Sequence, residues 1–159
     1  MKKSFLARAL FFFACATAAF ADVSLPASYG SHMVLQRDVP IRLRGWADPG
    51  EAVTVTHGDA VVRTTAAPDR RWAVELPARP AGEIPDLIVQ GKNKFVLGDL
   101  LAGDVWLCSG QSNMEFKLPR AEGGAEAVAA ATHPRIRLFG VGRKVAGTPQ
   151  DDVRGEWTA

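Results

Sequence analysis

Apolar and polar residues alternate in short segments between residues 30 and 101. Ile41 and Leu43 alternate with two arginines, and two valines further on alternate with threonines. A period of two is typical of strands with one buried and one exposed face, and segments at this spacing are typical of a sandwich or barrel. The pattern therefore predicts an all-β, sandwich-like domain over residues 22–101.

Turn-forming residues separate these segments. Asp48-Pro49-Gly50 stands between the first two runs, and we expect it to join them as a hairpin. Breaks rich in proline, glycine and asparagine follow each later run, as between antiparallel strands. The later alternating runs lie at residues 72–76, 87–89 and 95–97.

The pattern changes after Leu101. Residues 104–108 are almost continuously apolar, as in a strand buried on both faces of a parallel sheet. Residues 122–131 are rich in alanine and glutamate and predict a helix, and residues 135–139 predict another strand. Strand, helix, strand is the order of an α/β fold, so residues 102–159 are expected to form a second domain. We expect only its beginning, because a parallel sheet needs several strands with helices on both faces.

Residues 1–21 have the three parts of a secretory signal peptide. Basic residues come first, an apolar stretch follows from Leu10 to Ala19, and Ala19-Phe20-Ala21 is a small-x-small cleavage site. The apolar stretch is shorter than the ~20 residues that span a bilayer, which argues against a membrane anchor. We expect cleavage before Asp22, export to the periplasm or the extracellular space, and no membrane association afterwards.

Composition and charge narrow the choice of function. The 159 residues are 47% hydrophobic, which suits one ordinary domain or two small ones. The 19 basic and 17 acidic residues are scattered without a basic stripe, so nucleic acid is not an expected partner. Cleavage would leave Cys108 as the one cysteine, so no intrachain disulfide is expected, and the pattern predicts a small buried hydrophobe there.

Ser112 stands where the predicted strand at residues 104–108 enters turn-forming sequence. A hydroxyl on the turn after a strand projects from the carboxyl edge of a sheet, and nearby backbone N–H groups can hold an oxyanion. A structural interpretation is also open, because Ser112 and Glu115 fit the Ser-x-x-Glu capping box of a helix start. The pattern alone favours the structural interpretation, since Met114 stands where Gly-x-Ser-x-Gly has its second glycine.

Residues 103–116 closely resemble the nucleophile block of the sialate O-acetylesterases, within the SGNH hydrolase superfamily. The block reads Gly-Asp-Val-Trp-Leu-Cys-Ser-Gly-Gln-Ser-Asn-Met-Glu-Phe. The resemblance implies a mixed fold, in which an all-β domain is followed by the first part of an SGNH-type α/β domain. Other stretches that resemble the family's landmarks are residues 33–36, 39–40, 45–51, 71–72 and 136–139.

The resemblance implies a carbohydrate O-acetylesterase in which Ser112 attacks the acetyl carbonyl of an O-acetylated sialic acid or another acetylated glycan. The backbone N–H of the same serine would contribute to the oxyanion hole. Gln111 and Asn113, which flank the serine, are candidate substrate-binding residues. No metal and no other cofactor are implied.

The resemblance also places the histidine base, its aspartate and the remaining oxyanion donors in later blocks that this sequence does not contain. His32, His57 and His133 match none of those positions, and we expect them in loops or at the surface. Because a serine without a base is a poor nucleophile, the chain is expected to be a truncated and inactive fragment on its own. The alternative is an exported glycan-binding or structural β module without catalysis.

Two further sets of residues could suggest binding chemistry. Asp151 and Asp152 are expected to be solvated rather than to form a metal pair. Trp46, Trp72 and Trp106 are expected to be core residues of strands rather than platforms that stack on sugars. Neither set therefore adds a metal site or a sugar site to the prediction.

Overall fold

The computed structural model describes residues 22–159, so the predicted signal peptide at residues 1–21 lies outside the described residues. Strands follow one another through the first part of the described chain, and no helix interrupts them before residue 104. The predicted all-β character of this part is confirmed. The strands are β1 (Val34–Gln36), β2 (Ile41–Trp46), β3 (Ala52–His57), β4 (Ala60–Thr65), β5 (Arg71–Leu76), β6 (Gly82–Ile84), β7 (Leu87–Gln90), β8 (Lys94–Leu97) and β9 (Leu100–Gly103).

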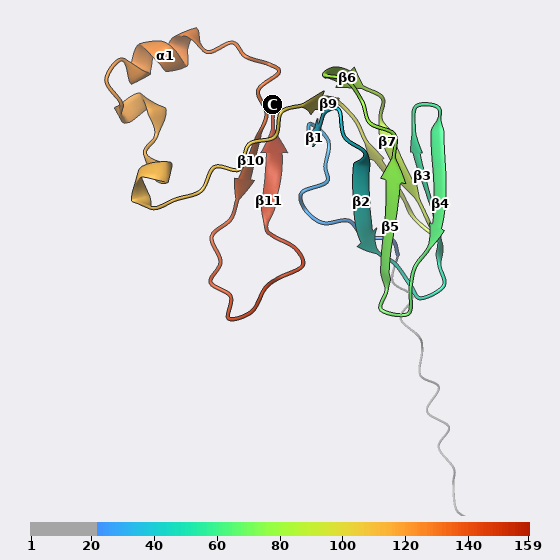
Figure 1. Ribbon diagram of the computed structural model, residues 1–159. Coiled ribbons are helices and arrows are strands. Elements are labelled where there is room, and N and C mark those ends of the chain that lie inside the picture. The colour runs from blue at the N-terminus through green and yellow to red at the C-terminus, as the bar shows by residue number, and fades with distance from the viewer. Residues whose placement is uncertain (1–21) are drawn as a thin grey trace, which may run out of the picture.

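Three sheets share these strands. The largest has four strands in the order β4-β3-β7-β8, and all of its neighbours are antiparallel. β2 and β5 form an antiparallel pair, and Figure 1 shows this pair lying over the four-stranded sheet. In the third sheet, β9 lies between β1, to which it is parallel, and β6, to which it is antiparallel.

Alternation along the strands builds the core between the two antiparallel sheets. In β5, the side chains at positions 72, 74 and 76 are buried while their neighbours are exposed. Burying one large apolar side chain contributes about 1.5–3 kcal/mol, so these strands supply most of the stabilisation of the domain. The buried apolar residues of the facing strands are Ile41, Leu43, Val53, Val55, Trp72, Val74, Leu76, Leu87 and Val89.

The predicted hairpin between the first two alternating runs is wrong. β2 pairs with β5, whereas β3 pairs with β4 and β7. The turn at residues 48–50 is present, but it carries the chain from one sheet to the other. The buried carboxylate of Glu51 holds this corner, because it accepts hydrogen bonds from the backbone N–H groups of Asp48 (3.2 Å) and Lys92 (2.8 Å). The corner is thereby tied to the turn between β7 and β8 instead of closing a hairpin.

After β9 the chain leaves the sandwich in an arc and returns beside β1, as Figure 1 shows. The predicted helix at residues 122–131 is confirmed, and the predicted strand at residues 135–139 is found a few residues later. That strand pairs with an antiparallel partner, so the described residues contain no parallel strand-helix-strand unit here. The elements of the arc are η1 (Ser112–Glu115), η2 (Leu118–Arg120), α1 (Gly124–Ala130), β10 (Leu138–Val141) and β11 (Gly155–Thr158).

Residues 104–108 do not form the predicted buried strand. They belong to no strand or helix, and Trp106 is 83% exposed while Leu107 is 92% exposed. An apolar run is buried only where neighbouring strands and helices cover it, and none of the residues from 22 to 159 does so. The expectations of a buried Cys108 and a core Trp106 are therefore wrong.

Two of the predicted core tryptophans, Trp72 and Trp46, lie in strands of the β domain. Trp72 is 3% exposed, as expected of a core residue, and Trp46 is half-buried. Within residues 22–159, no helix has the length and apolar character needed to cross a membrane.

Candidate functional site

Ser112 is the first residue of η1, and its side chain is exposed. The turn closes through two backbone hydrogen bonds, from the Met114 N–H to the Gln111 carbonyl (2.9 Å) and from the Phe116 N–H to the Asn113 carbonyl (3.2 Å). Gln111 and Asn113 are exposed on either side of the serine. A compact turn thus presents these three side chains together at the surface.

The predicted capping box is not formed. Ser112 lies inside η1, and the residue at the cap makes no side-chain hydrogen bond to the backbone. Glu115 instead forms an ion pair with the guanidinium of Arg143. No hydrogen bond among residues 22–159 uses the Ser112 hydroxyl, which is therefore available to a ligand.

The backbone around the serine explains two features of the motif. A Cβ atom on Gly110 would lie 2.7 Å from Cγ of Met114, so glycine at this position lets the methionine fold back over the turn. As the first residues of a helical turn, Ser112 and Asn113 have N–H groups without partners inside the turn. Such free N–H groups can donate to an oxyanion that forms beside the serine.

No hydrogen bond or ion pair among the described residues joins Ser112 to a histidine. His32 lies in a loop, where its Nδ1 is 2.6 Å from Oδ2 of Asp99, and His133 is exposed after α1. The expectation for these two histidines is met, but the expectation for His57 is wrong. His57 is completely buried in β3.

The first residues of the segment that leads to Ser112, Asp104 and Val105, are attached to the end of β1. The side-chain carbonyl of Gln36 accepts a hydrogen bond from the Val105 N–H (3.1 Å), and Nε of Arg37 donates to Asp104 (2.9 Å). The carboxylates of Asp104 and of the adjacent Asp38 raise the pKa of Arg37. These contacts fix the direction in which the chain leaves β9.

A second attachment, which we call the Arg137 clamp, consists of Arg137, Asp99 and His32. Arg137 donates to both oxygens of Asp99, at 2.6 and 3.0 Å, and its side chain is only 8% exposed. Hydrogen bonds from Arg137 and then from His32 lower the pKa of Asp99 to about 2. Asp99 and His32 both have positive φ, at 53° and 69°, a backbone conformation that costs non-glycine residues energy. The clamp thus joins the residue before β10 to two loops of the β domain.

The end of the described chain makes a third attachment. The indole N–H of Trp157 donates to the Ser28 carbonyl (2.9 Å), and its ring packs against Phe139 with centroids 5.3 Å apart. Asp151 pairs with Arg71 (2.6 Å), and Asp152 accepts a hydrogen bond from the Ala27 N–H (2.9 Å). The two aspartates are exposed, as expected, but each one anchors the tail.

Sequence reasoning missed these attachments, although it had marked some of their members. Gln36, Arg71 and Arg137 lie in stretches that resemble family landmarks, and each reaches across to a distant part of the chain. A polar residue inside a stretch that resembles the family was therefore the one feature of the sequence that could have indicated these long-range contacts. Within residues 22–159, no group of three or more histidine, cysteine, aspartate and glutamate side chains could hold a metal ion.

Comparisons with known proteins identify the relatives of this chain. No protein-family model matches the sequence. The chain is 33% identical to the sialate O-acetylesterase of Mus musculus over 141 residues, which cover 80% of this chain and 26% of that protein. It is 40% identical to the sialate O-acetylesterase of Homo sapiens over 103 residues, which cover 57% of this chain and 20% of that protein.

A solved structure agrees with these matches. The crystal structure of a carbohydrate acetylesterase from Xanthomonas citri superposes with a TM-score of 0.83 and 39% identity, covering 86% of this chain and 32% of that one. The chain spans about a quarter of the length of the curated relatives it matches. By sequence and by structure, the chain is similar to one part of the longer sialate O-acetylesterases and of a carbohydrate acetylesterase.

Proposed function

We propose that the protein removes O-acetyl groups from carbohydrates and that Ser112 is its nucleophile. The observation that carries the proposal is the match to the Xanthomonas citri carbohydrate acetylesterase over 86% of this chain. The exposed and unbonded hydroxyl of Ser112 is compatible with that role. Because the mouse and human relatives are named sialate O-acetylesterases, an O-acetylated sialic acid is the first substrate to test, with acetylated xylan sugars as the second.

In the proposed reaction, Oγ of Ser112 forms a bond to the acetyl carbonyl carbon, and its proton passes to a general base. The N–H groups of Ser112 and Asn113 stabilise the negative charge that develops on the carbonyl oxygen. The tetrahedral intermediate then breaks its bond to the sugar oxygen, which takes up the proton. Water attacks the acetyl-serine in the same manner, which releases acetate and restores the hydroxyl. Gln111 and Asn113 would contact sugar hydroxyl groups beside the serine.

The general base of this proposal comes from outside residues 22–159. His32 is engaged by Asp99, His57 is buried inside the sandwich, and His133 has no contact with the serine. Loss of the base in a serine hydrolase lowers the rate by about 10⁶-fold. We therefore place the base in the remainder of an SGNH-type α/β domain that begins near residue 102, and we expect the described residues alone to release acetate very slowly.

A chimera tests the role of Ser112 in a complete catalytic domain. In it, residues 22–159 replace the segment of the Xanthomonas citri acetylesterase on which they superpose. We expect the chimera to release acetate, and Ser112→Ala to lower its rate by about 10³-fold or more. Ser109→Ala, three residues earlier in the same exposed block, is the matched control and should retain activity. A folded chimera whose activity survives Ser112→Ala would disprove the assignment.

We also propose that the protein is exported after cleavage of residues 1–21. The support is the order of basic, apolar and small residues in that segment. N-terminal sequencing of the mature protein from a bacterial culture should give Asp22 as its first residue. A mature protein that begins at Met1 and stays with the cell's cytoplasmic fraction would contradict this proposal.

A further inference from the structure

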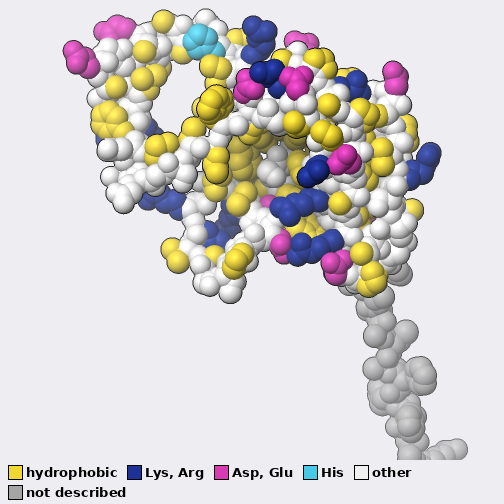
Figure 2. Space-filling model, in the orientation of Figure 1, with side chains coloured by type: hydrophobic (Ala, Val, Ile, Leu, Met, Phe, Trp, Pro, Cys, Tyr) yellow, Lys and Arg dark blue, Asp and Glu magenta, His cyan; other side chains and the backbone are white. Residues whose placement is uncertain are grey.

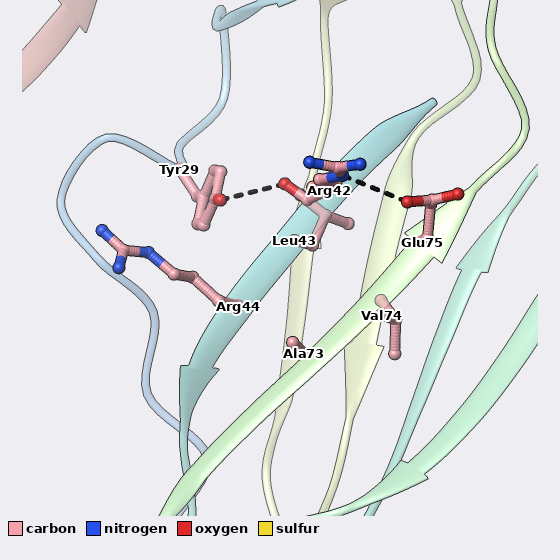
Figure 3. Close-up of a pocket in the computed structure, with 7 residues that line it drawn as sticks. All are labelled: Tyr29, Arg42, Leu43, Arg44, Ala73, Val74 and Glu75. Atoms are coloured by element: carbon pink, nitrogen blue, oxygen red, sulfur yellow. Dashed lines mark hydrogen bonds and ion pairs between the residues drawn. The ribbon is translucent and has the colours of Figure 1, made fainter. Parts of the chain in front are cut away.

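A pocket of about 560 Å³ lies on the outer face of the β2–β5 pair. Figure 2 shows a hollow on this face with Lys and Arg side chains gathered along its edge. Figure 3 shows the lining residues, with Tyr29 and Arg44 on one side of the pocket and Glu75 on the other. In Figure 1, β2 and β5 are separated from the yellow-orange segment that contains η1 by β10 and β11. The pocket is therefore distinct from the Ser112 turn.

The pocket follows from the sequence of the two strands. Arg42 and Arg44 point outward from β2, since they alternate with buried residues. The register places Ala73 opposite Arg44, and Glu75 opposite Arg42. The small side chain of Ala73 leaves room on the sheet surface, and the longer side chains around it become the walls. A pocket of this volume falls in the range of about 300–1,000 Å³ that is usual for small-molecule sites.

Arg44 supplies a positive charge without a counter-ion. Arg42 donates to Glu75 (3.1 Å), and Arg71 on the same face pairs with Asp151 (2.6 Å). In contrast, the Arg44 guanidinium makes no hydrogen bond or ion pair with any residue from 22 to 159. An exposed guanidinium at the wall of a pocket presents a planar fork of N–H donors that matches a carboxylate.

Tyr29 supplies an aromatic wall beside this cation. Its hydroxyl donates to the Arg42 carbonyl (3.2 Å), which fixes the ring over the edge of β2. Burial raises the pKa of the Tyr29 hydroxyl, while the positive charge of Arg44 opposes this shift, so the phenol stays neutral. A neutral, fixed ring offers an apolar face to the C–H groups of a sugar ring, and its position leaves Arg44 free beside it.

We infer that this pocket binds a sugar unit that carries a carboxylate, with Arg44 on the carboxylate, Tyr29 on the ring and Glu75 as an acceptor for hydroxyl groups. The carboxylate of Glu75 opposes a doubly charged phosphate, which favours a singly charged acid. This site is an addition to the proposed esterase activity and does not depend on it. It gives the chain a means of holding acidic glycans away from the Ser112 turn.

Nuclear magnetic resonance titration of the ¹⁵N-labelled full chain tests the inference. The probes are methyl glucuronide, N-acetylneuraminic acid and, as the uncharged control, methyl glucoside. We expect saturable shifts of the backbone signals of β2, β5 and Tyr29 with both acids, and affinity about tenfold lower for the glucoside, because a charge-assisted hydrogen bond is lost.

Variants separate the site from a general charge effect. Arg44→Gln should weaken binding of both acids about tenfold, whereas Arg63→Gln makes the same charge change on exposed β4 and should leave binding unchanged. Ala73→Leu should block the pocket without touching the core, because residue 73 is exposed. Ser112→Ala should bind like the wild type, so a failure of the esterase proposal and a failure of this one give different results.

Several results would overturn the inference. These are the absence of saturable shifts up to roughly 50 mM acid, equal affinity for the glucoside, or saturable shifts that leave β2, β5 and Tyr29 unchanged. Equal losses in Arg44→Gln and Arg63→Gln would also overturn it. Displacement of the sugar acids by an equal concentration of inorganic phosphate would identify a simple anion site and would reject a site for sugars.

Discussion

The β sandwich and the segment after Gly103 use apolar residues in opposite ways. In the sandwich, Leu43 of β2 is 2% exposed and Leu76 of β5 is 1% exposed. In the segment after Gly103, Leu107 is 92% exposed although its neighbours are also apolar. Alternating residues find partners within the described chain, whereas the continuous run finds none. A continuous apolar run therefore forms a buried strand only where other strands and helices cover it.

The two regions also differ in what holds them in place. The sandwich is held by apolar packing between facing sheets. The later segment is held against it mainly by polar contacts, of which the Arg137 clamp is the most buried, together with the Trp157 contact. Exposed ion pairs contribute about 0–1 kcal/mol each, and local opening starts in regions with few buried apolar contacts. Residues 104–159 should therefore open before the sandwich unfolds.

The largest expected effect comes from one pair of leucines. Leu43→Ala leaves a cavity in the packed core, and it should lower the free energy of unfolding by about 2–5 kcal/mol. Leu107→Ala removes the same atoms from an exposed position and should change it by less than about 0.5 kcal/mol. Urea unfolding of the full chain, followed by tryptophan fluorescence, measures both. Equal effects of the two substitutions would refute the difference between the regions.

A pair of glycines should give the next largest effect. A Cβ atom on Gly45 would collide with the Ser24 carbonyl oxygen and would lie 2.7 Å from the Trp72 ring, so Gly45→Ala forces the backbone of the buried strand β2 to move. We expect a loss of about 1–3 kcal/mol in the free energy of unfolding. Nothing lies within 4 Å of the same position on Gly140 of β10, so Gly140→Ala is the matched control. A Gly45→Ala chain as stable as the control would show that β2 can shift at this position without loss of stability.

The sequence predicted the sandwich better than the segment, for a physical reason. Alternation decides which face of each strand is buried, and the predicted inward positions of β2, β3, β5 and β7 are buried. Pairing is decided by contacts between distant strands, so the hairpin of the first two runs could not be told apart from a corner between sheets. Glu51, which fixes that corner, acts through a backbone N–H at Lys92, far along the chain.

The candidate site likewise has some features that could be predicted from the local sequence and others that could not. The turn around Ser112 and the exposure of its flanking residues follow from a short stretch of sequence, so the motif located them. The Arg137 clamp joins residues 32, 99 and 137, and His57 is buried through a fold in which its strand lies between β4 and β7. Neither arrangement has a local signature. The pocket beside Arg44 could likewise not be predicted from the sequence, because Ala73 and Tyr29 come close to Arg44 only after β2 and β5 have paired.

Removal of the Arg137 clamp should loosen the segment and leave the sandwich intact. Arg137→Met keeps most of the side-chain volume but removes both hydrogen bonds to Asp99. We expect hydrogen exchange of the β10 and β11 amides to become about tenfold faster, while that of β3 and β7 stays unchanged. Arg135→Met, two residues earlier and exposed, is the control. Faster exchange throughout the sandwich would mean that the two regions unfold as one unit.

Acid should loosen residues 104–159 over a pH range that is set by the pKa of Asp99. The pKa of Asp99 is lowered from 3.8 to about 2 by its hydrogen bonds, so the carboxylate favours the folded clamp above pH 3.8. This contribution is lost as the pH falls from 3.8 towards 2, because the unfolded chain takes up a proton first. Relative to the intrinsic exchange rate, which itself changes with pH, exchange of the β10 amides should accelerate through that window in the wild type. Arg137→Met should abolish the acceleration, and its persistence in the variant would assign the effect to other carboxylates.

The smallest expected effect concerns the sandwich at milder pH. Burial, with the nearby charge of Arg79, lowers the pKa of His57, which therefore stays neutral in the fold. The unfolded chain binds a proton near the ordinary pKa of 6.5, so stability should be constant above that pH and should fall below it. His57→Met, which cannot titrate, should flatten this decline in urea unfolding between pH 8 and pH 5, whereas His133→Met should not. An unchanged decline in His57→Met would show that His57 is protonated in the fold as readily as in the unfolded chain.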